Sequence, residues 1–456
     1  MPTPLTTGLG KFIAGLRYKD IPQGAIRFAQ MGFADCVGVM LAGAHEDPPQ
    51  ILRSILATPT NGEATLLFGE GRAAAPDAAW INGAAAHALD FDDVGQRGHP
   101  STVLVPAILA EAETLGASGE AMLTAYVAGY ETWAELVRRE ADSHHMKGWH
   151  PTGIFGAIGA AAACAKLRGL DAQKAAYAIA LGASQSAGIM SNFGTMTKPF
   201  HAGKAAHSGV IAARLAQKGF TAALDALEHP QGFLAAVSPA GKIDLEAPIE
   251  AGSSWKLACD GVGVKKYPLC YCTHRALDGM LDLLQANRID AAKVKQVTVS
   301  TSKRYIITLR NHAPQTGLEA KFSMEFAMTS ALIAKRASLA ELTDAFVLRP
   351  DVQALMKRVV VKQETREDAS GAAIYDGIVV ETEDGKTYNT QVNKIRGNFD
   401  SPLSRDELWA KFEACAEVGK ARVPAKALFD ALMALERVSN VRNLPGIAAT
   451  AVAAAA

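Results

Sequence analysis

Histidines that lie next to carboxylates and lysines are the residues of this chain best suited to acid–base chemistry. The segment 87–93 reads HALDFDD, and HPS follows at 99–101. On a helix, His87 and Asp90 would share one face at a spacing of three residues, so the carboxylate could orient the imidazole. His99 lies just before an expected helix start, which places it well for proton transfer. The alternative is a helix end whose acids are solvated.

A second histidine occurs in a similar setting. His150 lies in the sequence WHPTG, directly before a segment rich in glycine and alanine. Thr152 could cap a helix there, and the free amides of a helix N-terminus attract anions. Close packing between helices explains the glycines better than ligand binding does, but it leaves the histidine unexplained.

The segment 197–207, TKPFHAGKAAH, has a potentially cationic residue at every third position: Lys198, His201, Lys204 and His207. Pro199 and Gly203 favour a loop at the start of this segment, ahead of a helix. A solvated charged face would be the usual interpretation. However, no acid occurs between positions 188 and 224, so the segment could instead bind carboxylate or phosphate groups.

A third basic group, KKYP at 265–268 followed by His274, lies at the expected junction of two domains, where ligand clefts often form. Cys270, Cys272 and His274 alternate, so they would share one face of an extended segment. Metal sites usually have other spacings and a fourth ligand, so ordinary packing is the preferred interpretation and no metal site is predicted.

The elements that must position these residues are mostly helices. Segments with a helical period and few β-branched residues fill the first 260 positions; examples are Gly24–Leu41, Ala78–Leu89, Ala121–Arg139, Ala172–Ala183 and Ala205–Gln217. This part of the chain is expected to be all-helical.

After position 265 the pattern changes. Strands are expected at Val294–Thr301, Val359–Lys362 and Ile378–Thr382, with a turn at 383–386 leading to a further strand, and helices at Ser323–Lys335 and Ser338–Thr343. Helix returns at Ser404, where Glu407 completes a capping box. We therefore expect a mainly α chain with an inserted α+β domain: a helical domain from residues 1–262 and 400–456, and a smaller α+β domain from 263–399.

Composition excludes several classes of protein. The chain has 456 residues, enough for two or three domains, and its 46 Lys+Arg balance 46 Asp+Glu, which disfavours nucleic-acid binding. The N-terminus lacks the pattern of a secretory signal, and the apolar stretch 153–165 is too short to span a bilayer, so we expect a cytoplasmic protein with no membrane contact. Six cysteines without a Cys-x-x-Cys pair argue against a disulfide framework or an iron–sulfur cluster.

The sequence also lacks a P-loop, a Rossmann glycine fingerprint, a Gly-x-Ser-x-Gly elbow and a His-Glu-x-x-His helix. Histidines, a carboxylate and several lysines fit proton abstraction next to a carboxylate best, because that reaction needs a base and cations that stabilise the developing charge.

The ordered series of motifs resembles the MmgE/PrpD family, which includes 2-methylcitrate dehydratase, cis-aconitate decarboxylase and iminodisuccinate epimerase. The motifs are HALDFDD at 87–93, HPS at 99–101, HPTG at 150–153, TKPFHAGKAA at 197–206, KKYPLCYCTH at 265–274 and AKFSMEF at 320–326. The resemblance covers nearly the whole chain. It implies a large helical domain with a smaller α+β lid, a homodimer, and catalysis without a metal or an organic cofactor.

The resemblance also implies roles for individual residues. His99 and Asp90 would form the proton-transfer pair, and His150 would orient the substrate or act as a second acid–base group. Lys198 and Lys265 would bind substrate carboxylates. The remaining candidates for substrate binding are His201, Lys204 and His274.

Three positions depart from the decarboxylase pattern: Val94 replaces Thr, Cys270 replaces His and Phe326 replaces Tyr. These changes remove hydrogen-bonding groups from the expected cleft, which disfavours cis-aconitate decarboxylation. The dehydratase pattern differs as well, with Thr-Trp in place of Val94-Gly95.

The main expectation is therefore a cofactor-independent lyase or isomerase that removes a proton α to a carboxylate of a small di- or tricarboxylic acid, most nearly a 2-methylcitrate dehydratase-like hydro-lyase. An iminodisuccinate-type epimerase and a cis-aconitate-type carboxy-lyase are the alternatives. More remote are a non-catalytic carboxylate-binding protein and a metal-dependent enzyme, whose ligands would be His87, Asp90, Asp92 and Asp93.

Overall fold

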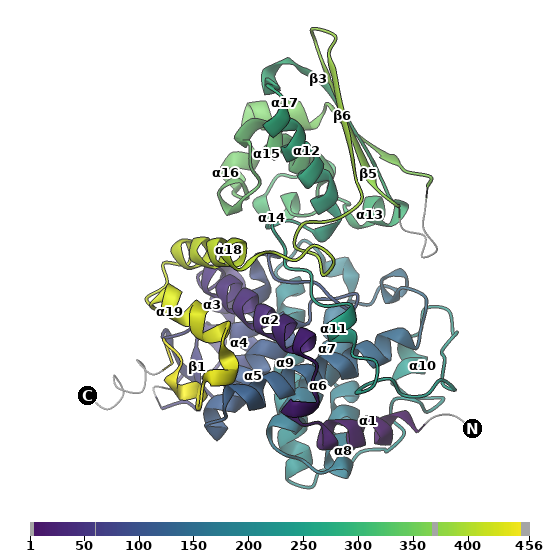
Figure 1. Ribbon diagram of the computed structural model, residues 1–456, viewed down its shortest axis with the longest axis vertical. Coiled ribbons are helices and arrows are strands. Elements are labelled where there is room, and N and C mark those ends of the chain that lie inside the picture. The colour runs from purple at the N-terminus through teal and green to yellow at the C-terminus, as the bar shows by residue number, and fades with distance from the viewer. Residues whose placement is uncertain (1–3, 60, 367–372, 448–456) are drawn as a thin grey trace. The chain divides into compact units, whose positions relative to one another are not determined.

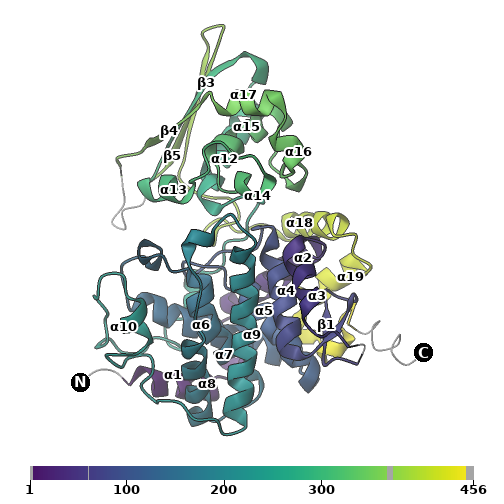
Figure 2. The same ribbon diagram turned by 180° about the vertical axis from the view of Figure 1, so that it is seen from behind.

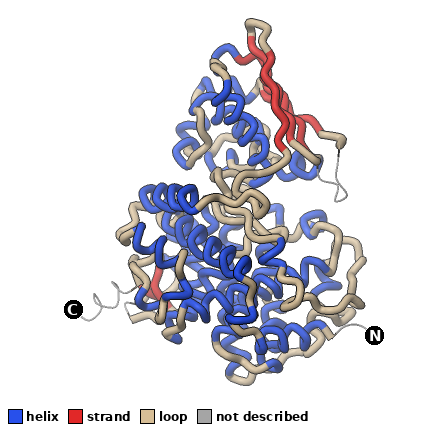
Figure 3. The backbone as a smooth tube through the Cα atoms, viewed as in Figure 1, coloured by secondary structure: helices blue, strands red, loops and turns tan. Residues whose placement is uncertain are grey.

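The computed structural model describes residues 4–59, 61–366 and 373–447, so residues 448–456 of the expected helical return lie outside the described part. The chain divides into two compact units, one of Met1–Val264 with Ser404–Ala456 and one of Lys265–Leu403. Helices dominate and the sheets are small, as the ribbon and the tube both show (Figure 1, Figure 3). The chain is thus mainly α with a small sheet domain.

The first unit is built from helices contributed by two distant stretches of sequence. They are α1 (Leu5–Gly15), α2 (Gln23–Ala42), α3 (Asp47–Ile55), α4 (Ala75–Ala88), α5 (Ser101–Leu115), α6 (Gly119–Arg138), α7 (Pro151–Leu167), α8 (Ala172–Ser184), α9 (Thr197–Gln217), α10 (Phe233–Val237), α11 (Lys256–Cys259), α18 (Arg405–Val418) and α19 (Ala425–Leu432). The C-terminal α18 packs against α2, near the other end of the chain (Figure 1, Figure 2). This contact closes the unit around a shared core.

The central helices are buried on nearly all sides. The α2 helix is long and apolar enough to cross a membrane by length and composition, but 89% of its most apolar window is buried inside the protein, as in a core helix of a globular domain. Small residues allow close crossings: a Cβ on Gly83 of α4 would lie 2.8 Å from the Cα of Gly203 on α9. The α4 and α9 helices therefore approach with almost no side chain between them.

The second unit carries a four-stranded sheet in the order β4-β3-β5-β6. Its strands are β3 (Val294–Thr301), β4 (Val359–Gln363), β5 (Asp376–Thr382) and β6 (Thr387–Val392), with β3 and β4 parallel and the other neighbours antiparallel. Its helices are α12 (His274–Ala286), α13 (Lys303–Thr308), α14 (Gly317–Ala320), α15 (Met324–Ala334), α16 (Asp344–Val347) and α17 (Pro350–Met356). The α12 helix packs on β5 and β6 and also against α15.

Three local expectations were wrong. The first 260 residues are not all helical, because β1 (Ala64–Leu66) and β2 (Gly71–Ala73) form a hairpin of strands too short to show a period. The segment Ser338–Thr343 is a single 3₁₀ turn at Leu339–Glu341. Helix α9 begins at Thr197 and includes Pro199, because amides in a first helical turn have no intrahelical partner and a proline there loses no hydrogen bond.

Candidate active site

The three carboxylates that follow α4 lie outside the helix. Helix α4 ends at Ala88, and Asp90 has a left-handed backbone with φ of 52°. The expected helical face shared by His87 and Asp90 is therefore wrong. The interpretation with solvated acids is also wrong, because Asp90, Asp92 and Asp93 are all buried.

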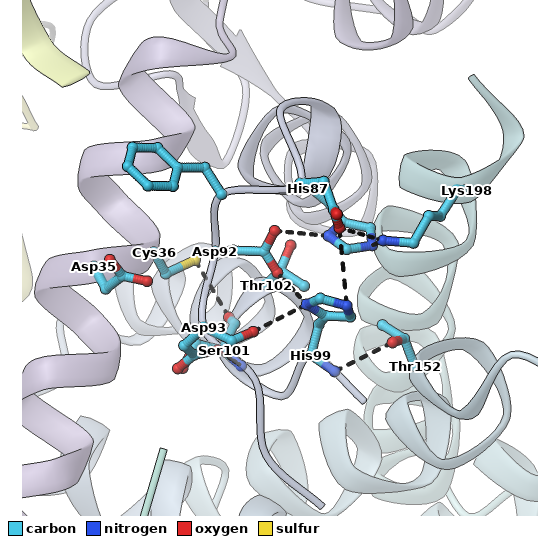
Figure 4. A network of polar contacts seen from close by, with 12 residues as sticks. Asp35, Cys36, His87, Asp92, Asp93, His99, Ser101, Thr102, Thr152 and Lys198 are labelled. Carbon is cyan, nitrogen blue, oxygen red and sulfur yellow. Dashed lines mark hydrogen bonds and ion pairs between the residues drawn. The ribbon is translucent and has the colours of Figure 1, made fainter. Parts of the chain in front are cut away.

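His87 bridges a carboxylate and an ammonium group. Its Nδ1 lies 2.8 Å from Oδ1 of Asp92, and its Nε2 lies 3.0 Å from Nζ of Lys198 (Figure 4). Burial lowers the pKa of His87 to about 3, and the nearby Lys198 ammonium acts in the same direction. The neutral ring therefore donates its Nδ1–H to Asp92 and accepts a hydrogen bond from Lys198 at Nε2.

Lys198, the second residue of α9, links the helix to the acidic segment. Its Nζ also lies 2.5 Å from Oδ1 of Asp90, and its side chain is buried. The close crossing of α4 and α9 explains how two residues of separate helices, His87 and Lys198, come within hydrogen-bond distance. The site thus contains a lysine cation between an imidazole and a carboxylate.

His99 is held so that one ring nitrogen is fixed and the other faces Asp90. Nδ1 lies 2.9 Å from Oδ2 of Asp92 and 3.0 Å from the carbonyl oxygen of Asp93. Both neighbours are acceptors, so Nδ1 carries a proton and Nε2 is the basic nitrogen of the neutral ring. Nε2 lies 4.0 Å from Oδ1 of Asp90. The backbone amide of His99 donates to Oγ1 of Thr152 at 3.2 Å (Figure 4).

His99 is also the most accessible member of the group. Its side chain is 13% exposed, against 6% for Asp90 and 0% for His87. A small molecule can therefore reach His99 more readily than it can reach the other groups, which suits a residue that exchanges a proton with a substrate.

Asp92 orients both imidazoles, a role that sequence reasoning missed. Burial raises the pKa of Asp92, but His87 and His99 outweigh that effect and hold it well below its usual range. An ionised carboxylate that accepts from Nδ1 of a histidine fixes the tautomer and stabilises the ring once it is protonated. Asp92 lies in a loop, so no helical spacing connects it to its partners; the only signal was several acids in an apolar stretch.

Asp93 points away from this group. Burial raises the pKa of Asp93 well above its usual range. Its Oδ1 accepts from the backbone amide of Ser101, and its Oδ2 contacts the Ser101 hydroxyl (Figure 4). The Ser101 hydroxyl lies 2.6 Å from that of Tyr126. Asp93 therefore secures the start of α5 and is not part of an acidic ligand set.

His150 and His201 form a pair beside the group. Nδ1 of His150 lies 3.1 Å from Nδ1 of His201, and the His150 ring stacks against His87 with centroids 6.1 Å apart. Burial lowers the pKa of His150 well below its usual value and that of His201 to about 4. The structure therefore brings together Asp90, His99, His150, Lys198 and His201, five of the eight residues predicted for the site.

The contacts of the other three predicted residues are different. Nζ of Lys204 is 3.0 Å from Nδ1 of His207 and 4.8 Å from the ring centroid of Trp80. Lys265 and His274 belong to the second unit, where both are buried. Nε2 of His274 lies 3.2 Å from the carbonyl oxygen of Leu269.

The same group contains side chains that could bind a divalent metal ion. Ligand atoms of His87, Asp90, Asp92 and His99 lie within 4.8 Å of one another, a donor set that suits several divalent ions. The set differs from the predicted one, because His99 takes the place of Asp93. Nζ of Lys198 already lies within hydrogen-bond distance of both His87 and Asp90. An ion bound there would have to displace this lysine or be repelled by it, so the donor set fits a metal poorly.

The fold and these residues define a protein of the MmgE/PrpD family. The family's N-terminal domain matches residues 7–246, and its C-terminal domain matches residues 267–433. The chain belongs to this family, as the motifs predicted.

Relatives with assigned activities are lyases of that family. A cis-aconitate decarboxylase of Homo sapiens is 27% identical, covering 90% of this chain and 88% of the relative. The cis-aconitate decarboxylase of Mus musculus is 26% identical and covers 96% of this chain and 91% of the relative. That of Aspergillus terreus is 23% identical and covers 96% of this chain and 95% of the relative. The chain is an enzyme of the lyase class. These relatives support the decarboxylase alternative and not the dehydratase that was the main expectation.

Proposed function

We propose that this enzyme decarboxylates a small unsaturated tricarboxylic acid of the cis-aconitate type, without a metal or an organic cofactor. The observation that carries the proposal is the orientation of His99, whose Nδ1 is fixed by Asp92 while Nε2 faces Asp90 at 4.0 Å. The whole-length similarity to cis-aconitate decarboxylases supports the choice of substrate.

The reaction needs one proton and a stabilised negative charge. When the bond between carbon and a carboxylate breaks, the electron pair moves through the adjacent double bond to a second carbon, which takes up a proton. The tricarboxylate plus one proton gives CO2 and a dicarboxylate. Protonated His99 would supply that proton from Nε2, because the Asp92 carboxylate stabilises the imidazolium.

Cations would hold the remaining carboxylates. Lys198 is a buried ammonium group paired with Asp90. Its charge would stabilise the negative charge that develops on the substrate during the reaction. The carboxylate-binding roles of Lys265 and His274 stay predictions from the family resemblance. They are tested by the KM of Lys265→Met, which we expect to rise at least about tenfold with a smaller change in kcat.

A second candidate is a hydro-lyase of the 2-methylcitrate type. Val94, Cys270 and Phe326 lack the hydrogen-bonding groups of the decarboxylase pattern, and a site built around those groups would lose affinity for its substrate without them. In this reaction His99 would act as a base and not as an acid: the neutral ring would remove the proton α to the carboxylate before water leaves.

The decisive experiment is proton NMR in D2O with EDTA-treated enzyme and a panel of acids: cis-aconitate, 2-methylcitrate, citrate, malate, tartrate and iminodisuccinate. Loss of CO2 from cis-aconitate with deuterium incorporation into the product supports the proposal. Dehydration of 2-methylcitrate or α-exchange in iminodisuccinate would instead assign the hydro-lyase or the epimerase. His229→Asn, a variant of a histidine outside the group, is the control and should keep wild-type activity. If none of the acids in the panel reacts, all three activities are contradicted.

A further inference from the structure

The backbone between the two site carboxylates is held from the far end of the chain. Phe91 lies between Asp90 and Asp92, and its carbonyl oxygen accepts a hydrogen bond from Nζ of Lys411 at 2.7 Å. The same ammonium lies 4.0 Å from the centroid of the Phe91 ring, which is a cation–π distance. One lysine therefore contacts both the backbone and the side chain of Phe91.

Lys411 lies on α18, the first helix after the chain returns to the first unit. Its side chain is 6% exposed, and Nζ is 2.6 Å from Oδ1 of Asp35 on α2, whose side chain is fully buried. Burial raises the pKa of the Asp35 carboxyl, and the Lys411 ammonium opposes that change. A charge removed from water in this way needs each of its partners, so Lys411 has a fixed position in the core.

Asp90 needs such support. Its φ of 52° is uncommon for a residue other than glycine, and such a strained conformation persists where the surrounding structure enforces it. On the side-chain side, Lys198 binds the Asp90 carboxylate. On the backbone side, Lys411 fixes the next carbonyl, that of Phe91.

We propose that Lys411 is a positioning residue for the reaction. By fixing the Phe91 carbonyl, it sets the direction of the chain on both sides, so that Asp90 meets Lys198 and Asp92 meets His99. This inference rests on the proposed function, because it assumes that the segment from Asp90 to Asp92 belongs to the catalytic group. It assigns a role in catalysis to a helix that contributes no group to the chemistry itself.

The rival explanation is that Lys411 and Asp35 form an ion pair that only stabilises the fold. Substitutions can distinguish this structural role from the positioning role. Lys411→Met leaves the buried Asp35 carboxylate without its cation, so it should lower stability as well as activity. The double variant Asp35→Asn/Lys411→Met removes both charges, so most of the stability should return. The Phe91 contact is still missing from the double variant, so its activity should stay low.

The experiment measures kcat, KM and thermal midpoint for wild type, Lys411→Met, the double variant and Asp35→Asn. We expect kcat about 10- to 100-fold lower in both variants that lack Lys411, as is typical of residues that orient a catalytic histidine, with KM within about threefold. Asp35→Asn keeps the Phe91 contact and should retain most of kcat. Lys426→Met removes an exposed lysine paired with Asp430 and serves as the matched control. If the double variant regains kcat together with stability, the ion pair is only structural and the inference is wrong.

A second readout does not depend on turnover. In protein labelled with ¹⁵N-histidine, the Nδ1–H signals of His87 and His99 report their hydrogen bonds to Asp92. We expect both signals to shift or to exchange faster with water in the double variant, and unchanged signals would overturn the inference. If wild type is silent on every acid while these signals still depend on Lys411, the proposed function fails and the positioning role stands.

Discussion

His150 and His201 face each other through the same ring atom, with the two Nδ1 nitrogens 3.1 Å apart. Because the pKa of each ring is lowered by burial, both are neutral near pH 7, and one Nδ1 must donate while the other accepts. Nε2 of His150 has no hydrogen-bond partner among the described residues. The choice of donor in this pair therefore decides whether His150 presents a proton or a lone pair at Nε2.

We expect His201→Phe to lower kcat about 10- to 100-fold, because His150 loses the group that sets its tautomer. His201→Gln keeps one hydrogen-bonding group near that position and should lower kcat less. Steady-state kinetics measure both, and the pH profile of kcat should shift in His201→Phe only. Equal kinetics in the two variants would show that hydrogen bonding by residue 201 does not set the state of His150.

Asp92 should matter almost as much as His99. Asp92→Asn keeps the shape of the side chain but removes the charge that stabilises protonated His99, so we expect kcat to fall about 100- to 1000-fold. His99→Asn should lower kcat at least as far. Asp93→Asn alters the start of α5 instead, and it should lower the thermal midpoint more than kcat. Single-turnover rates of the three variants check this order, and a fully active Asp92→Asn would remove Asp92 from the mechanism.

Chelation should not reduce activity, because Lys198 supplies the cation between His87 and Asp90. We expect the same kcat before and after treatment with EDTA, and no gain on adding Mg²⁺ or Mn²⁺. Lys198→Ala removes the ammonium and leaves two imidazoles and two carboxylates within 4.8 Å. Calorimetry should therefore detect Zn²⁺ binding to this variant at least about tenfold tighter than to wild type. Equal affinities would mean that Lys198 does not exclude metals.

A histidine outside the site should make the protein sensitive to acid. Burial lowers the pKa of His144 to about 4, and neither ring nitrogen has a hydrogen-bond partner among the described residues. Between about pH 6.5 and 4 the unfolded chain binds a proton at His144 that the folded protein does not. The free energy of unfolding therefore falls as the pH falls through this window.

His144→Leu should remove this contribution. Urea denaturation at pH 7, 6 and 5 gives the free energy of unfolding, and we expect its fall on acidification to be smaller in the variant by up to about 1.4 kcal/mol per pH unit. The difference between variant and wild type is the useful quantity, because the raised pKa values of the buried acids Asp93 and Glu131 act in the opposite direction. A pH dependence identical to that of wild type would contradict the prediction.

Periodicity was a sound guide wherever an element is long or has a clear local signal. The expected helix Gly24–Leu41 is α2 (Gln23–Ala42), and the expected strand Val294–Thr301 is β3. The capping box of Ser404 and Glu407 is confirmed at the start of α18. These features depend on neighbours in the sequence, which is the information that a single chain provides.

Contacts between residues far apart in the sequence, and the backbone conformations they enforce, could not be predicted from the sequence. Local patterns made His99, Asp90 and Lys198 candidates: Asp90 by polar residues in an apolar stretch, His99 by its place before a helix start, and Lys198 by a run of cationic residues without acids. The role of Asp92 depends on the left-handed backbone at Asp90, and no pattern of residue types indicates that conformation. The start of α9 was missed because Pro199 and Gly203 favour a loop locally, whereas the close crossing with α4 requires a small residue at position 203.

Lys411 and Phe91 are 320 residues apart in sequence, and this separation has a consequence for biosynthesis. At typical rates of translation, roughly 5–20 residues per second, a ribosome needs about 15 to 60 s to make the intervening chain. During that time Asp35 and Phe91 lack Lys411, although every group of the proton-transfer set in the first unit is present once the chain has grown past His201. The nascent protein should therefore stay inactive until α18 emerges, well after its chemical groups are complete.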